Sequence, residues 1–434
     1  MAAPAAASSH DPYAALRYPE FRRLVAGSFL LTLALLAQEV ALGYELYLLT
    51  RDPLTLGFLG LAEAIPFIAL ALVGGHLADR REKRNLILGA LLAIFVASTW
   101  LLALSLDASR AALPQTPWLL AIYGAIVLIG FARGIFSPSA SSLKAFLVPR
   151  EIYGNGATWS SAGWQVGAIL GPVSGGLLYA AFGLEGTLLV VMALLAASAV
   201  LVAGIRKRGV PAAGEGGDDL WASLKEGLAF VRNTPIILYA ITLDLFSVLF
   251  GGVVAILPVF AEDVLHVGAT EVGLMRAASS VGAVLTLLLC AWYPPTRRAW
   301  RNLLWVIAGF GLATLVFALS RSFWLSMFAL FLTGAFDSVS VVIRSTILQV
   351  MPPDHLRGRV QSVNSVFLSC SNEIGAFESG LAARLMGAVP SVVFGAGMTL
   401  SIVAGVWTRS GKLFAVNLLE LGNERKPDTP AAVA

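Results

Sequence analysis

Residues 74–84 read G-G-H-L-A-D-R-R-E-K-R, a short polar stretch between two long apolar runs. It combines two carboxylates, Asp79 and Glu82, with four cations, which are Arg80, Arg81, Lys83 and Arg84. Lys and Arg of short loops gather on the cytoplasmic side of a membrane, and a carboxylate at a membrane edge needs a cation or a helix N-terminus facing it. Gly74 and Gly75 allow two helix backbones to approach closely. The stretch therefore predicts a cytoplasmic turn between two closely packed membrane helices.

The composition excludes a soluble globular protein. The chain of 434 residues is 57% hydrophobic and 13% charged, with a mean hydropathy of +0.79, so too little polar surface exists to cover a globule. The net charge of +4 is expected from cytoplasmic loops and does not indicate a nucleic-acid partner. Cys290 and Cys370 lie in apolar runs without CxxC or His spacing, so we expect neither a metal site nor a disulfide. Residues 1–9 lack the features of a cleavable signal peptide.

Twelve segments are long and apolar enough to span a bilayer, for which about 20 apolar residues are needed. They are Leu24–Leu49, Thr55–Ala78, Leu86–Leu106, Leu119–Ile135, Thr158–Phe182, Leu184–Ile205, Ile236–Ala261, Val272–Trp292, Leu303–Leu319, Phe323–Ile343, Val360–Met386 and Val389–Trp407. The sequence thus predicts an all-α membrane protein of twelve transmembrane helices.

The distribution of cations over the loops supports this count. Most of the 30 Lys and Arg residues, Lys144 among them, fall on the termini and alternate loops that would be cytoplasmic. The opposite loops hold only Arg51, Arg110 and Arg321. A miscounted span would destroy this asymmetry, so we expect a multi-pass membrane protein with both termini cytoplasmic.

The chain divides into two halves that repeat each other. Residues 1–205 and 235–412 form two predicted six-helix bundles, and residues 413–434 form a cytoplasmic tail. Residues 206–234 join the bundles by a Gly-rich linker, which is followed by an amphipathic surface helix at 220–231. The stretch G-F-A-R ending at Arg133 corresponds to G-A-F-D ending at Asp337, and T-L-G-F-L-G-L-A before Glu63 corresponds to E-V-G-L-M-R-A-A after Thr270. Repeated halves of this kind form a substrate site between them near the membrane midplane.

Ionisable groups inside the bilayer are costly and are functional candidates by default. The acids in such positions are Glu39, Glu45, Glu63, Asp244, Asp337, Glu373 and Glu378, and the bases are Arg133, Arg276, Arg344 and Arg384. Glu45, Arg276 and Arg384 lie nearer predicted helix ends, where long side chains can reach the interface. Asp337 and Arg344 share a helix stripe but are too far apart to pair directly. Arg133 and Asp337 occupy repeat-equivalent positions and could pair across the halves or with loop acids, and a purely structural salt bridge is an equal alternative.

Proton coupling has several candidates. Gln38 and Glu39 lie in the middle of the first predicted helix, and a carboxyl group in apolar surroundings can carry a proton. Our hypothesis is that Glu39 or Asp244, each on the first helix of a half, is protonated. Asp337, Glu373 and Glu378 are further candidates, but Glu373 and Glu378 lie about 140° apart around one helix, so at most one of them faces the cavity. The substrate-cavity candidates are Gln38, Arg133, Arg344 and Asn372.

The fifth predicted helix contains a run of small residues suited to tight helix contact, namely Gly167, Gly171, Pro172, Gly175 and Gly176. This run resembles the helix-5 motif of exporters that exchange substrate for protons in the major facilitator superfamily. Likewise, Gly75, Asp79, Arg80 and Arg84 resemble that superfamily's motif between helices 2 and 3, where the Asp and the bases latch two halves together. The second half departs from the pattern, because the loop Tyr293–Asn302 has no Asp and the eleventh helix has Gly375, Glu378 and Gly380 but no Pro. A gate held mainly by the Asp79 side is therefore expected.

The stretch R-S-T-I-L-Q-V-M-P-P-D-H-L-R-G-R-V-Q-S-V-N-S-V-F from Arg344, followed by S-N-E-I-G-A-F-E-S-G, resembles the branch that contains the enterobactin exporters and the transmembrane secretion effectors. The resemblance implies a proton-driven exporter of the bacterial inner membrane that exports a siderophore or another amphiphilic small molecule by rocker-switch alternating access. It also implies that the Asp79 loop docks near Gly358–Gln361. Because intramembrane acids outnumber bases, a cationic or neutral drug is at least as good a candidate substrate as a siderophore.

Other functions are less favoured. An importer or a lysolipid flippase has the same fold, and a non-transporting sensor would be expected to have a larger cytoplasmic tail than Val416–Ala434. No phosphate-binding loop, nucleophile elbow or metal-ligand cluster occurs in the sequence, so we expect no enzymatic activity, no cofactor and no built-in ATPase. The expected partners are a small-molecule substrate, protons and membrane lipid, with the protein acting as a monomer.

Overall fold

The computed structural model describes residues 11–206, 220–295 and 298–414. Within these ranges all regular elements are helices. The first half contains α1 (Pro19–Thr50), α2 (Pro53–Arg80), α3 (Lys83–Ser105), α4 (Asp107–Ala112), α5 (Gln115–Leu147) and α6 (Tyr153–Ala203), with short turns η1 (Ala15–Arg17) and η2 (Arg150–Ile152). The second contains α8 (Pro235–Gly251), η3 (Val253–Ile256), α9 (Leu257–Val259), η4 (Phe260–Leu265), α10 (Ala269–Trp292), α11 (Ala299–Leu319), α12 (Phe323–Val350), α13 (Asp354–Met386), α14 (Ala388–Arg409) and η5 (Gly411–Leu413). The all-α membrane fold is confirmed.

Ten helices of the described part are long and apolar enough to cross a membrane. One of them includes α6, whose 51 residues change direction at Gly183, where φ is +66°. This is the boundary predicted between the fifth and sixth spans, and a positive φ is readily adopted by glycine. α13, which contains the eleventh predicted span, is not among the ten. The total of twelve spans stays a prediction.

The seventh span is broken, although we predicted a continuous helix over Ile236–Ala261. α8 ends at Gly251, and the chain continues through η3 and α9 into the π-helical turn η4. Two consecutive glycines favour such an interruption because glycine is a poor helix former. A Cβ at Gly252 would lie 2.9 Å from Ser379 Oγ and 3.1 Å from the Gly375 carbonyl oxygen. The glycine therefore lets the broken segment lie directly against α13.

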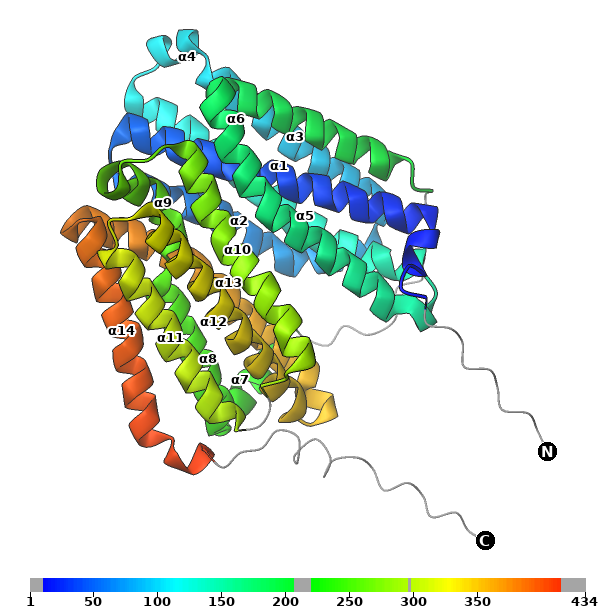
Figure 1. Cartoon of the computed structure of the whole chain (residues 1–434). Coiled ribbons are helices and arrows are strands. Elements are labelled where there is room, and N and C mark those ends of the chain that lie inside the picture. Colours follow the sequence, from blue (N-terminus) through cyan, green and yellow to red (C-terminus); the bar gives the residue numbers. More distant parts are fainter. Residues whose placement is uncertain (1–10, 207–219, 296–297, 415–434) are drawn as a thin grey trace.

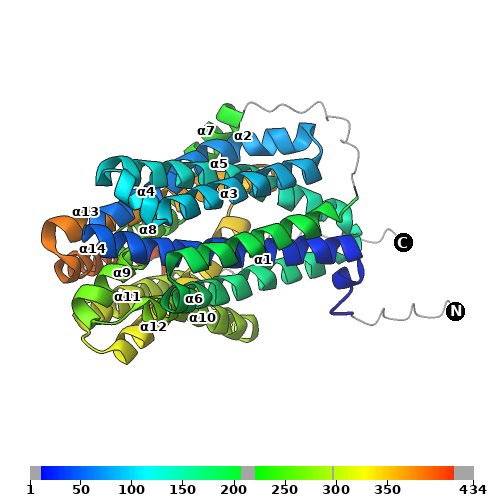
Figure 2. The same ribbon diagram turned by 90° about the horizontal axis from the view of Figure 1, so that it is seen from above.

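The two halves meet through two helix pairs, α2 with α13 and α6 with α10. Figure 1 shows that the halves lie close together at the end that carries α9 and diverge toward the end where α1 begins. Figure 2, seen from above, also places α4 and α9 at one end and the start of α1 at the other. At the α9 end a buried apolar cluster includes Tyr47 of the first half and Phe260 of the second. The halves are thus sealed together at one end.

The internal repeat is visible in how glycines pack. A Cβ at Gly130 on α5 would collide with the backbone of Glu63 on α2, and a Cβ at Gly334 on α12 would collide with the backbone of Ser279 on α10. Gly130 and Gly334 correspond in the two aligned stretches, and so do Glu63 and Ser279. Each half therefore uses an equivalent glycine to bring equivalent helices into backbone contact.

The polar stretch at 74–84 is more helical than predicted. α2 continues through Asp79 to Arg80, and α3 begins at Lys83 after Glu82, whose carboxylate accepts a hydrogen bond from the Asn85 backbone N–H at 2.8 Å. Arg84 donates to the Ala203 carbonyl oxygen at 2.6 Å. The side chains of residues 71–80, including those of Asp79 and Arg80, lie outside the described part.

The surface helix predicted at 220–231 is present as α7 (Leu220–Asn233), and it packs against α8 and α13. A Cβ at Gly227 would lie 2.8 Å from the Arg359 carbonyl oxygen, and Glu226 forms an ion pair with the Arg359 guanidinium. The predicted surface helix is therefore attached to the start of α13 as well as to the connection between the halves.

Candidate functional site

A cavity of about 580 Å³ lies between the two halves. Its charged and amide lining residues are Glu39 (α1), Glu63 (α2), Arg133 (α5), Arg276 (α10), Asp337 (α12) and Asn372 (α13). The unwound segment after α8 also lines it, from Gly251 to Pro258. Irregular backbone at membrane depth is tolerated where it borders such a cavity, because lipid cannot satisfy its polar groups. The cavity therefore brings together polar groups from both halves.

Glu39 and Arg276 form an ion pair across the cavity, with Oε1 and Nη2 separated by 2.7 Å. The Glu39 side chain is 40% exposed and the Arg276 side chain 20%. Its place near a predicted helix end left open that Arg276 reaches the membrane interface. The structure instead places it about two turns into α10, where it faces the cavity.

Arg133 pairs within its own half, with Glu63 of α2. Gly130 makes this pairing possible, since it lets α5 contact the α2 backbone at Glu63 and places Arg133 one turn further along the same helix. The Arg133 guanidinium also lies 5.6 Å from the centre of the Phe67 ring. The sequence left open a partner in the other half or a loop acid for Arg133, and Glu63 is neither of these.

The second half holds a buried ion pair between Asp244 of α8 and Arg344 of α12. Both side chains are less than 8% exposed, and Arg344 Nε donates to Ser340 Oγ at 3.2 Å. Asp337 shares a small hollow with Asp244 and is itself exposed to the main cavity. Arg344 and Asp244 therefore lie behind the cavity wall that Asp337 forms.

The remaining candidates are dispersed. Gln38 is buried, and its Oε1 accepts a hydrogen bond from Ser98 Oγ of α3 at 2.8 Å. Asn372 is exposed in the cavity and donates to the Leu368 carbonyl oxygen at 2.9 Å. Glu378 lines a separate small hollow beside Phe250, and the Glu373 side chain lies outside the described part. Of the predicted proton-coupling and substrate-cavity candidates, the main cavity thus unites Glu39, Arg133, Asp337 and Asn372.

The small residues of α6 lie at two helix contacts. A Cβ at Gly171 would lie 2.7 Å from Leu36 Cβ on α1, and Gly167 and Gly175 face the same helix. Gly176 instead faces Ala269 of α10, and Pro172 lies against Gly273 of α10. The motif therefore holds the α6–α1 contact within one half and the α6–α10 contact between the halves.

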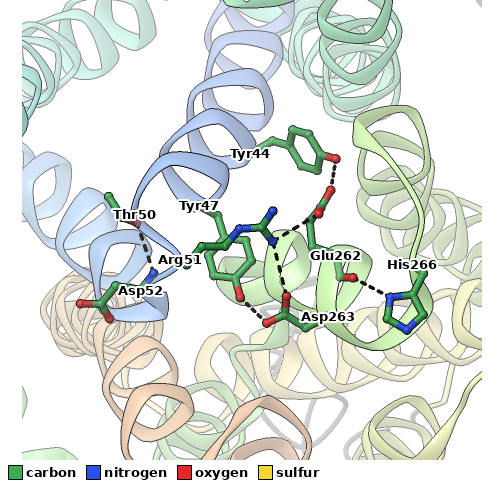
Figure 3. Close-up of polar contacts among 8 residues, drawn as sticks. All are labelled: Tyr44, Tyr47, Thr50, Arg51, Asp52, Glu262, Asp263 and His266. Carbon is green, nitrogen blue, oxygen red and sulfur yellow. Dashed lines mark hydrogen bonds and ion pairs between the residues drawn. The ribbon is translucent and has the colours of Figure 1, made fainter. Parts of the chain in front are cut away.

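A polar cluster that we did not predict joins the halves at the α9 end (Figure 3). Its members, called here the closing cluster, are Tyr44, Tyr47, Arg51, Glu262 and Asp263. Tyr44 donates to Glu262 and Tyr47 to Asp263, while Arg51 Nη1 lies 3.3 Å from Glu262 and 3.7 Å from Asp263. A signal existed in the sequence, because Arg51 and this acidic pair occupy predicted loops on the same side of the membrane.

Comparisons with known proteins agree with this architecture. The profile of the Major Facilitator Superfamily matches residues 23–376. The enterobactin exporter EntS of Escherichia coli is 27% identical over 429 residues, covering 96% of this chain and 95% of its own. EntS of Citrobacter koseri is 26% identical over 397 residues, covering 88% and 90%.

Solved structures show the same fold at low identity. A variant of the nucleoside transporter NupG has a TM-score of 0.70 at 12% identity, covering 90% of this chain and 99% of its own. A bacterial homologue of the lysosomal transporter Spinster has a TM-score of 0.66 at 15% identity, covering 95% and 99%. The chain is therefore a multi-pass membrane protein that belongs to the major facilitator superfamily of transporters.

Proposed function

We propose that this protein is a proton-coupled secondary transporter that exports an amphiphilic small molecule, a drug or a siderophore, across the bacterial inner membrane. Its relatives are named as exporters of enterobactin, and its cavity is lined by both apolar and charged side chains. The proposal includes no enzymatic step. In this proposal the protein moves its substrate by changing conformation, without altering the substrate chemically.

The movement is rocker-switch alternating access. The halves are sealed at the α9 end by the closing cluster and by the apolar contacts around Tyr47 and Phe260. With both termini in the cytoplasm, the sealed end faces outward and the diverging end faces inward. The α2–α13 and α6–α10 contacts, with their glycines, are the surfaces on which the halves turn. This arrangement corresponds to an inward-facing state.

The observation that carries the proposal is the ion pair between Glu39 and Arg276. Protonation of Glu39 would cancel its attraction to Arg276, and the two halves would lose a bond that spans the cavity. Asp244 is the weaker candidate because its partner Arg344 belongs to the same half and both are buried. Glu39 is therefore the proton carrier in this proposal.

The pairing also changes the charge argument about the substrate. Glu39, Glu45, Glu63 and Asp244 each have an arginine partner, and Asp337, Glu373 and Glu378 make up the excess of acids seen in the sequence. In the main cavity the acids Glu39, Glu63 and Asp337 exceed the bases Arg133 and Arg276 by only one, so the count of charges there favours a cationic drug only weakly.

A reconstituted assay tests the function. Purified protein is placed in vesicles, a pH gradient is imposed, and a panel of cationic drugs and catecholates is offered from the side opposite the proton-rich compartment. An exporter that exchanges substrate for protons accumulates substrate in the acidic compartment, and collapse of the gradient abolishes accumulation. Accumulation in the opposite direction would instead indicate an importer, transfer of lysolipid would indicate a flippase, and a protein that binds but moves nothing would be a sensor.

A further inference from the structure

A second pocket of about 310 Å³ opens from the cavity into the first half. Its walls come from α1, α2, α5 and α6, without contribution from the second half among the described residues. It shares Glu39, Glu63, Arg133 and Trp164 with the main cavity. A molecule in the main cavity can therefore extend one part into this side pocket.

Lys144 gives the side pocket its charge. We counted Lys144 among the loop cations, but it lies on α5, is half-buried and lines the pocket. The two acids of the pocket are already neutralised, Glu39 by Arg276 and Glu63 by Arg133. Among the described side chains none forms an ion pair or a hydrogen bond with Lys144. An ammonium group in this position is costly without a counter-charge, so the pocket is suited to an anion.

Hydroxyl groups beside the pocket lack partners as well. The Oγ atoms of Ser28 and Ser160 are buried and have no hydrogen-bond partner in the described part, and both residues line the pocket. Buried polar atoms without partners are uncommon in proteins and call for an explanation. Ser141, one turn from Lys144 on α5, lines the same wall. Ser141 is exposed, and its hydroxyl can donate a hydrogen bond to an oxygen of a bound anion, while the Ser28 and Ser160 hydroxyls have no competing partner in the described part.

Four aromatic side chains line the pocket beside aliphatic ones. Phe29, Phe67, Phe136 and Trp164 line it, and the Trp164 side chain is exposed to the space that the pocket shares with the main cavity. Aromatic side chains bind flat rings through stacked and edge-to-face contacts. Ligand sites commonly combine such apolar walls with a few polar groups that fix orientation.

We infer that this side pocket is a subsite for an aromatic anion, such as an aryl carboxylate, with Lys144 as the counter-charge. The ring lies among the aromatic residues, and the negative oxygens face Lys144 and the free hydroxyls. The binding of such an anion does not depend on the proposed function. The statement that this anion is part of the exported molecule does rest on the proposed function. The transporter then selects amphiphilic anions over cations.

The test compares three ligands that share one ring system and differ in charge: naphthoate, naphthamide and naphthylmethylammonium. Binding is measured by calorimetry with the full chain in lipid nanodiscs, and empty nanodiscs give the blank. We expect the wild type to bind naphthoate most tightly. Lys144→Met should weaken naphthoate binding about tenfold or more and leave naphthamide unchanged, while Lys144→Arg should retain naphthoate binding.

Lys83→Met is the matched control, because Lys83 lies 4.9 Å from the Phe146 ring and does not line the pocket. It should bind naphthoate like the wild type, and thermal unfolding checks that each variant is folded. Unchanged naphthoate binding in folded Lys144→Met, or tighter binding of the ammonium ligand by the wild type, would overturn the inference. A transport assay in vesicles distinguishes failure of this inference from failure of the proposed function. If naphthoate binding depends on Lys144 but no ligand is transported, the subsite is supported and export is rejected. If export is unchanged by substitution of Lys144, only the subsite is rejected.

Discussion

Glu39 of α1 and Arg276 of α10 lie 2.7 Å apart and join the two halves of the protein across the cavity. Glu39→Gln removes one charge of this pair and leaves the Arg276 guanidinium without its partner in a partly buried site. We expect transport driven by a pH gradient to fall at least tenfold in reconstituted vesicles. The double variant Glu39→Gln/Arg276→Gln should regain movement down a substrate gradient but not its response to the pH gradient.

Glu63→Gln is the control for that experiment, since it removes an equal charge from the same cavity but from a pair confined to one half. It should keep its response to the pH gradient. If Glu39→Gln transports with full proton coupling, Glu39 is not the carrier.

The closing cluster should set how often the outer end opens. Arg51→Ala removes two ion pairs to the second half, with Glu262 and Asp263, and should shift the population toward the outward-open state. The native cysteines are first replaced by serine, and spin labels are attached at Ala111 and Arg321, which are both exposed and lie one on each half. Pulsed electron paramagnetic resonance then measures the distance between the two labels. A longer distance should become more populated in Arg51→Ala.

Arg110→Ala provides the comparison, because it breaks an ion pair with Glu45 that lies within the first half at the same end. This variant should keep the wild-type distance distribution. Equal distributions in Arg51→Ala and the wild type would show that the closing cluster does not hold the outer end shut.

Much of this fold was predictable because apolar runs and loop charges determine where helices cross a membrane. Glu39 was found as an intramembrane carboxylate, but its partner Arg276 is on α10, and no sequence spacing relates these two helices. Lys144 was misplaced because the apolar run stops at Ile135 and is followed by serines. The helix continues to Leu147, with part of this polar face turned to the side pocket rather than to lipid. The break at Gly251 and Gly252 had a visible signal, two adjacent glycines, but its role depends on contact with α13.

The paired glycines of the repeat should be essential for packing. Gly334→Ala would place a methyl group against the Ser279 carbonyl, and such overpacking commonly costs about 1–3 kcal/mol. We expect its thermal unfolding midpoint in detergent to fall by several degrees, and Gly130→Ala to behave alike. Gly397→Ala on α14 is the control, since a Cβ there meets nothing within 4 Å. A midpoint for Gly334→Ala equal to that of Gly397→Ala would contradict the predicted close contact.

Variants of the buried pair Asp244–Arg344 distinguish a structural role of this pair from a role in proton coupling. Asp244→Asn leaves a buried guanidinium without its charge partner, and breaking such pairs commonly costs about 3–5 kcal/mol. Replacing both residues with apolar ones, as in Asp244→Leu/Arg344→Met, removes both charges and should recover most of the thermal stability. If Asp244 only stabilises the second half, this double variant also keeps its response to a pH gradient. A different result would transfer the proton-carrier role from Glu39 to Asp244: a double variant that is stable and moves substrate down its own gradient, but no longer responds to the pH gradient. Loss of packing alone cannot produce that combination.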